Sequence, residues 1–197
     1  YTMLEENRHV FLCGIAGIGK SELTKAYAKK YDKEYTNILY ITYSGDLKND
    51  IVNMDFADDV DENETADARF SRHHRLLRRL RDDSLLIIDN FNTVTTRDSL
   101  LDVVLNYHCR IIFMTRSKFD NYASVNLEEI ADTETLISLM GCFYSDAEKQ
   151  RPVLEQIIQA VHRHTLAVEL SARLLETGKI FLWLRLPVFR AGCLQTG

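Results

Sequence analysis

Residues 14 to 21 read G-I-A-G-I-G-K-S, the residue types and spacing of a loop that binds nucleotide phosphates. Gly14, Gly17 and Gly19 permit backbone conformations that turn successive N–H groups toward phosphate oxygens. Lys20 is expected to reach the β and γ phosphates, and the Ser21 hydroxyl to ligate Mg²⁺. We assign three further loop residues to the same nucleotide site: Ala16, Ile18 and Glu22.

Such a loop works only between a buried strand and a helix. The apolar run His9 to Cys13 ends at Gly14, as a central parallel strand should. After the loop, Leu23, Ala26, Tyr27 and Lys30 fall at helical spacing in a segment of good helix formers. The positive end of that helix would add to the anion site. The sequence therefore predicts an ADP or ATP site.

A second apolar run, Ser84 to Phe91, contains an acid at its polar end. Asp89 is predicted to assist Ser21 at the Mg²⁺ ion, since a carboxylate at the tip of a neighbouring strand commonly does so. Asn90 follows where many hydrolases of this class carry a second acid. An amide can position water but is a poor base, so we expect slow hydrolysis at best. Glu22 and Asp46 remain open as alternative bases.

Thr115 and Arg116 end another buried run, Cys109 to Ser117. An arginine at the carboxyl end of a strand can sense a γ phosphate, because its guanidinium pairs with phosphate through two hydrogen bonds. A surface arginine on a loop would look the same. With Lys20, Asp89 and Asn90, Arg116 completes the predicted catalytic set.

Strand and helix patterns alternate along most of the chain and then stop. Asn37 to Tyr43 and Ser124 to Leu127 are the remaining strand patterns, and a helix is expected from about Arg97 to Tyr107. This alternation predicts an α/β fold with a parallel, doubly wound sheet of about five strands flanked by helices. Three parts are expected: a nucleotide-binding domain over 1–130, a helical subdomain over 131–179, and a disordered or non-native tail over 180–197.

Composition sets further bounds. The chain has 197 residues, is 46% hydrophobic and 27% charged, and carries a net charge of −5, which argues against a protein that coats nucleic acid. No run is long enough to span a membrane, and the four scattered cysteines suggest reduced packing residues. We therefore expect a cytoplasmic protein without membrane partners. The first residue, Tyr1, suggests an excised fragment.

A predicted helix from Thr65 to Arg81 is rich in arginine and follows six acidic residues between Asp55 and Glu64. The arginines could bind phosphate or nucleic acid, although a solvated face balanced by the acidic loop is the favoured interpretation. His73 and His74 are adjacent in sequence and cannot share one helix face as metal ligands.

Taken together, the motifs G-I-A-G-I-G-K-S, L-L-I-I-D-N-F and C-R-I-I-F-M-T-R-S resemble the nucleotide-binding domain of STAND-class P-loop ATPases, particularly the NB-ARC type of bacterial relatives. The resemblance covers about residues 8 to 177. It continues into N-L-E-E-I-A-D-T-E-T-L-I-S-L-M and ends near H-R-H-T-L-A-V-E-L-S-A-R-L-L, which is similar to the family's G-x-P-L-A-L motif.

The resemblance implies a signalling switch in which ADP locks a closed monomer and ATP releases a self-associating state. It implies that Arg116 is the sensor arginine and that residues 131–179 form a lid. In that lid His164, Thr165 and Leu166 would lie over the nucleotide base and sugar, with Thr165 standing where the family has proline. The family's winged-helix domain does not follow within this chain, so complete switching is not expected of it alone.

Two other functions stay open. One is a small-molecule or nucleoside kinase, which the acidic segment from Gly45 to Glu64 disfavours for an anionic acceptor. The other is an AAA+ ATPase of the replication-initiator kind acting on nucleic acid, which only the arginine-rich helix favours.

Overall fold

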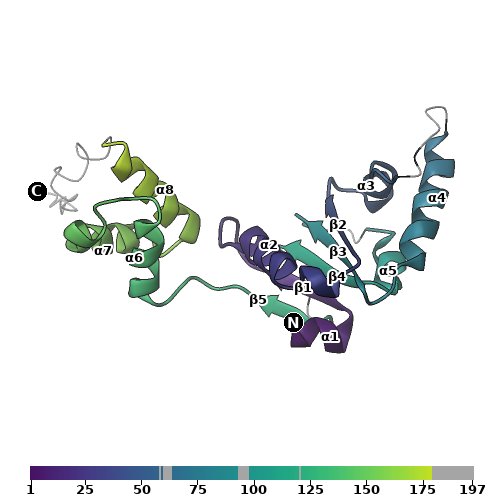
Figure 1. The fold of residues 1–197 in the computed structure, drawn as a ribbon, viewed down its shortest axis with the longest axis horizontal. Helices are drawn as coiled ribbons and strands as arrows, with labels where there is room; N and C mark the ends of the chain where they lie inside the picture. The colour runs from purple at the N-terminus through teal and green to yellow at the C-terminus, as the bar shows by residue number, and fades with distance from the viewer. Residues whose placement is uncertain (58, 60–63, 93–97, 120, 179–197) are drawn as a thin grey trace, which may run out of the picture. The chain divides into compact units, whose positions relative to one another are not determined.

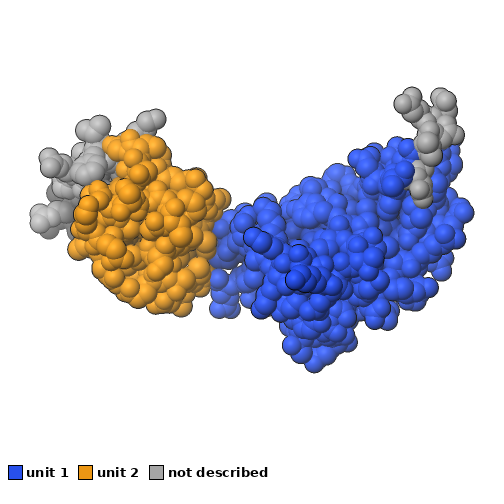
Figure 2. All heavy atoms as spheres, viewed as in Figure 1, with its two compact units in different colours: residues 1–128 blue, residues 129–197 orange. Residues whose placement is uncertain are grey.

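The computed structural model describes residues 1–57, 59, 64–92, 98–119 and 121–178. The chain separates into two compact units, residues 1–128 and 129–197 (Figure 2). The tail predicted over 180–197, the start of the helix predicted from Arg97 and most of the acidic segment between 58 and 63 lie outside the described residues.

The first unit is built on a five-stranded parallel sheet with the order β2-β3-β4-β1-β5 (Figure 1). Its strands are β1 (His9–Cys13), β2 (Asn37–Thr42), β3 (Ser84–Asp89), β4 (Arg110–Thr115) and β5 (Ser124–Asn126). Each coincides with an apolar run of the sequence, and the predicted parallel α/β fold is confirmed. The carboxyl ends of β1, β3 and β4 therefore share one edge of the sheet.

Helices cover both faces of this sheet (Figure 1). On one face α1 (Thr2–Asn7) and α2 (Lys20–Lys30) pack on a core that includes Leu12, Leu85 and Ile112. On the other face α3 (Leu47–Val52), α4 (Ala66–Arg79) and α5 (Leu101–Leu105) enclose a larger core that includes Phe11 and Phe113. The six-residue helices α1 and α3 were not predicted, because they are too short to show a helical period.

The helix predicted after the phosphate loop is α2, and only part of its apolar positions face the sheet. Leu23 is 47% exposed, and Ala26 and Lys30 are also exposed, whereas Thr24 is buried. The Thr24 hydroxyl lies 3.0 Å from the Lys20 carbonyl oxygen and 3.1 Å from the Met114 sulfur. Of the four residues at helical spacing, Tyr27 packs against the core of this face of the sheet.

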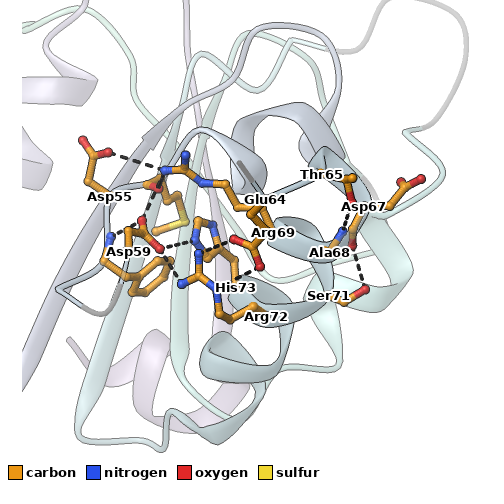
Figure 3. Close-up of polar contacts among 12 residues, drawn as sticks. Asp55, Asp59, Glu64, Thr65, Asp67, Ala68, Arg69, Ser71, Arg72 and His73 are labelled. Carbon is orange, nitrogen blue, oxygen red and sulfur yellow. Dashed lines mark hydrogen bonds and ion pairs between the residues drawn. The ribbon is translucent and has the colours of Figure 1, made fainter. Parts of the chain in front are cut away.

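Two acids of the segment before α4 are fixed to that helix by ion pairs (Figure 3). Asp59 accepts hydrogen bonds from the Phe56 backbone N–H (2.9 Å), from Arg69 (3.2 Å) and from Arg72. Its carboxylate is also 2.9 Å from Nε2 of His73, a ring with no exposed surface. Glu64 pairs with Arg72 at 2.6 Å.

The other ring nitrogen of His73, Nδ1, lies 2.8 Å from the Ile51 carbonyl oxygen. This buried histidine therefore joins α3, α4 and the acidic segment, and it is a structural residue. Across the part of the chain that the structure describes, no group of three histidine, cysteine or acidic side chains could hold a metal ion.

The second unit is helical. It contains α6 (Thr133–Gly141), a short 3₁₀ turn η2 (Glu148–Gln150), α7 (Arg151–Ala160) and α8 (Thr165–Glu176). These helices share one core, in which Leu136, Leu154 and Val168 are fully buried. Among the described residues, no helix is long and apolar enough to cross a membrane.

The hydrogen bonds and ion pairs of Asp59 predict how the stability of the fold changes at low pH. Hydrogen bonds from the Phe56 N–H, together with His73 and Arg72, hold the pKa of Asp59 below its usual range. A lowered folded-state pKa contributes stability that is fully present above the unfolded value of roughly 3.9 and is lost as the pH falls from there through the folded-state pKa. Asp59→Asn should therefore lower the free energy of unfolding at neutral pH and flatten its fall below roughly pH 5.

Urea denaturation at several pH values, followed by circular dichroism, measures both effects. Asp55→Asn is the matched control, because the Asp55 side chain is fully exposed and lies 3.7 Å from Arg69. An Asp59→Asn protein with the wild-type pH dependence would show that the carboxylate contributes nothing.

Candidate functional site

The predicted phosphate loop connects β1 to the amino terminus of α2. Gly19 is the residue that caps this terminus, with φ of 111°, a conformation that residues with a side chain rarely adopt. No side chain caps the helix, so its first backbone N–H groups are available as donors to an anion. With the dipole of an eleven-residue helix behind them, these donors suit a phosphate group.

Gly14 is required where the loop packs against its neighbours. A Cβ atom here would lie 3.0 Å from Cγ2 of Ile18 and 3.1 Å from the carbonyl oxygen of Leu127. The Gly14 N–H donates to the Thr115 carbonyl oxygen at 3.2 Å, and Ile18 is buried. The loop is therefore held against β4 and the segment after β5.

Lys20 makes hydrogen bonds within the loop and lies near the charged groups Asp89 and Arg116. Its Nζ donates to the carbonyl oxygens of Gly14 (2.6 Å) and Ile15 (2.8 Å) within the loop. Burial lowers the pKa of Lys20, and the charge of Arg116 lowers it further, while Asp89 acts in the opposite direction. The structure thus brings Lys20, Asp89 and Arg116, predicted from three separate motifs, into one electrostatic site.

Asp89 is the last residue of β3, and its carboxylate has two donors. The Asn90 backbone N–H donates at 2.7 Å, and the Tyr40 hydroxyl donates to the other oxygen. Burial and then this hydrogen bond raise the pKa of Tyr40 to about 12, so its proton stays in place to orient the carboxylate. Sequence reasoning missed Tyr40, although it lies two residues before Thr42, the residue paired with Asp89.

The turn after Asp89 is anchored by Phe91. This ring has no exposed surface, and its centroid lies 5.1 Å from that of Phe113 and 6.5 Å from that of Phe11. The Phe91 N–H donates to the Met114 carbonyl oxygen at 2.8 Å, which ties the turn to β4. Asn90 accordingly adopts φ of 58°, a left-handed conformation that asparagine tolerates.

Asn92 links this turn to the next strand end. Its Oδ1 accepts from the Arg116 backbone N–H at 2.7 Å, and its Nδ2 donates to Oδ1 of Asn90. Thr115 is fully buried, with its hydroxyl accepting from the Ser117 N–H at 3.0 Å, whereas Arg116 is exposed. Arg116 is therefore the residue of this pair that can reach a ligand. Asn92 was not predicted, because the contact joins distant segments.

Of the other predicted residues, Ser21 lies next to Lys20, whereas Glu22 and Asp46 have hydrogen-bond or ion-pair partners of their own. Ser21 is the second residue of α2, half-buried beside Lys20. Glu22 is exposed and pairs with Lys25 at 2.8 Å. Asp46 accepts from the Lys48 N–H at 2.9 Å and caps α3. This helix follows the edge strand β2, and β3 and β4 lie between β2 and β1 in the sheet. The structure thus gives both alternative bases other partners.

The predicted lid residues belong to the second unit, at the start of α8. His164 caps this helix, its Nδ1 accepting from the Ala167 N–H at 3.3 Å. Thr165 is the first helical residue, a position that suits proline, and its buried hydroxyl has no hydrogen-bond partner within the described structure. Leu166 is 43% exposed. Their approach to a nucleotide stays a prediction.

The donors fit a magnesium nucleotide. Mg²⁺ usually keeps several waters and binds one or two protein oxygens together with phosphate oxygens. The described residues offer no metal cluster made of protein ligands alone, whereas Ser21 and Asp89 can supply those one or two oxygens. A bound nucleotide would provide the rest, and metal binding would then depend on the nucleotide.

A family model described as an AAA domain matches residues 3–122, which include the phosphate loop, Asp89 and Arg116. No curated protein matches the sequence. Among solved structures, the Drosophila ORC bound to DNA is similar with 14% identity and a TM-score of 0.55, over 88% of this chain and 56% of that one. A crystal structure of a DNA replication initiation factor is similar with 13% identity and a TM-score of 0.51, over 90% of this chain and 59% of that one.

Identities this low show a shared fold alone, and the chain spans less than two thirds of either structure. The family match confirms the predicted P-loop ATPase at the level of an AAA domain. The narrower resemblance to STAND and NB-ARC proteins stays a prediction.

The role assigned to Asp89 can be measured directly. Asp89→Asn keeps the shape but removes the charge, so ADP affinity should fall about tenfold or more when Mg²⁺ is present, in line with the loss of a metal-orienting carboxylate. ADP affinity in a chelator should change little. Asp82→Asn, at an exposed position before β3, is the control for charge. Equal losses with and without Mg²⁺, measured by calorimetry, would contradict the metal role.

Proposed function

Because the chain belongs to the AAA domain family, we propose that it is the ADP- and ATP-binding switch module of a larger signalling or regulatory ATPase of the STAND and NB-ARC type. In this proposal Mg²⁺ accompanies the nucleotide and intrinsic hydrolysis is slow or absent. One observation carries the proposal: the phosphate loop follows β1, and the carboxyl ends of the parallel strands β3 and β4, at Asp89 and before Arg116, lie at the same edge of the sheet.

Each group has a role that follows from its position. The loop and the uncapped start of α2 would bind the phosphates, with Lys20 neutralising their charge. Ser21 and Asp89 would hold the metal side of the nucleotide. Arg116 would distinguish ATP from ADP, because its backbone is fixed by Asn92 while its side chain is exposed.

Slow hydrolysis follows from the chemistry at residue 90. Activation of water needs a base close to the γ phosphate, and the side chain after Asp89 is an amide that already interacts with Asn92. Glu22 and Asp46 have partners of their own. A site with good phosphate donors, and with none of the weighed bases placed for catalysis among the described residues, is suited to holding a nucleotide, as a switch requires.

In the complete protein we propose that the second unit acts as a lid, with His164, Thr165 and Leu166 near the base and sugar, and that ATP favours self-association through the nucleotide-binding domain.

A replication-initiator-like ATPase is the second candidate. The fold is shared with the ORC bound to DNA and with a DNA replication initiation factor, and α4 carries exposed arginines. An initiator would bind DNA in a nucleotide-dependent way, whereas a STAND switch would change its oligomeric state. Sedimentation of the full-length protein with ADP and with ATP, in the presence and absence of DNA, separates the two.

Replacing the phosphate-loop lysine tests nucleotide binding. Hydrogen bonds to charged groups contribute about 1.5–3 kcal/mol, so Lys20→Ala should weaken ADP binding by about 10- to 100-fold in calorimetry. Lys25→Ala removes the same charge from an exposed position on the same helix and should bind ADP normally. Undiminished ADP affinity in the Lys20→Ala protein would refute the phosphate site.

The substitution Asn90→Asp tests whether the lack of a carboxylate at residue 90 explains slow hydrolysis. Asn90→Asp places a carboxylate after Asp89, and aspartate tolerates the left-handed backbone of this position. General-base catalysis contributes about 10²- to 10⁴-fold, so phosphate release from ATP should rise by about tenfold or more. Asn49→Asp, which makes the same change at an exposed position of α3, is the control. If wild type already hydrolyses ATP rapidly, or if Asn90→Asp is no faster, the explanation by residue 90 is wrong.

A further inference from the structure

The arginines of α4 divide into two groups with different surroundings. Arg69 and Arg72, in the first half of the helix, are engaged with Asp59 and Glu64 (Figure 3). Their side chains are 33% and 27% exposed. For this half, the expectation that acidic residues balance the arginines is met.

The second group has no such partners. Arg75, Arg78 and Arg79 are exposed and make no ion pair within the described residues. With Arg81, two histidines and Ser71 they surround a hollow of about 440 Å³ at the end of α4, lined by Ser71, His74, Arg75, Arg78, Arg79, Arg81 and His108. Four guanidinium groups therefore gather within seven residues of a chain whose net charge is −5.

This arrangement costs stability unless an anion accompanies it. Arg75 lies three and four residues before Arg78 and Arg79, and like charges at these spacings destabilise a helix. The carboxyl end of a helix favours cations, but its dipole corresponds to only about half a negative charge. The dipole therefore accounts for less than one of the four arginines.

The ring of His74, which lines the hollow, is held in place by Tyr107 and Phe70. Its Nδ1 lies 2.8 Å from the Tyr107 hydroxyl, and its ring stacks on Phe70 with centroids 5.6 Å apart. Burial and then the charge of Arg78 lower the pKa of His74. The cationic character of the surface thus comes from the arginines, which can each present two N–H groups to a phosphate oxygen pair.

We propose that this surface, defined by Arg75, Arg78, Arg79, Arg81, His74 and His108, binds the phosphate backbone of nucleic acid without reading its sequence. Along α4, the three guanidinium groups of Arg75, Arg78 and Arg79 fall within a helical rise of about 6 Å. A DNA duplex carries one charge per about 1.7 Å of axis, so several phosphates fit this density of cations. An extended acidic peptide offers same-face carboxylates only about every 7 Å.

The proposal stands apart from the nucleotide switch, because it concerns a helix on the opposite face of the sheet from α2. It is tested with the full chain and a fluorescein-labelled DNA duplex of arbitrary sequence, by anisotropy over a series of salt concentrations. Saturating Mg-ADP is present throughout to occupy the phosphate loop. The test variant is Arg75→Gln/Arg78→Gln/Arg79→Gln.

The matched control is Lys29→Gln/Lys30→Gln/Lys33→Gln, which removes the same charge from exposed positions at and after the end of α2. The arginine variant should lose about tenfold or more in affinity at low salt. Its slope of log K against log salt should be shallower by about 2 to 3, one unit for each lost phosphate contact. The lysine variant should keep both values.

Three results would overturn the proposal: no duplex binding by wild type, equal losses in the two triple variants, or binding of polyglutamate in place of DNA. Circular dichroism confirms that both variants are folded. Lys20→Ala should bind the duplex as wild type does, so failure of the nucleotide site and failure of this surface are separate outcomes.

Discussion

The site depends on the parallel alignment of β1, β4 and β3, whose carboxyl ends meet at one edge of the sheet. A buried aromatic cluster on one face of these strands maintains that alignment: Phe11 of β1 and Phe113 of β4 stack at 4.5 Å, and Phe91 packs against both. Because Phe91 directly follows Asp89 and Asn90, the packing of one ring determines where two functional side chains leave the sheet.

Around this edge, backbone hydrogen bonds connect the three motifs. Gly14 donates to Thr115, Phe91 donates to Met114, and Arg116 donates to the side chain of Asn92. A displacement of any one strand end would therefore move the other two. This coupling suits a module that must respond to the number of phosphates on a nucleotide, since the ligand would contact all three segments while the sheet remains rigid.

The two halves of α4 show how one helix can serve structure and surface at once. Toward its start, arginines and the buried His73 fix the acidic segment through Asp59. Toward its end, arginines project into solvent without acidic partners among the described residues. Composition alone described a single arginine-rich helix, because the pairing of each side chain depends on which residues α3 and the preceding segment bring within reach.

The sequence by itself determined the strands and where the phosphate loop, Asp89 and Arg116 lie at their ends, because apolar runs and glycine spacing are local properties of the chain. The roles of these residues at a nucleotide stay predictions. The tertiary structure decided the inward face of α2, the burial of His73, and the contacts of Tyr40 with Asp89 and of Asn92 with Arg116. These join residues 49 and 24 positions apart, so strand order and register must be known before they can be found. The periodicity of apolar residues does not give strand order or register, since it shows which residues share one face of a helix or strand but not which other element packs against that face.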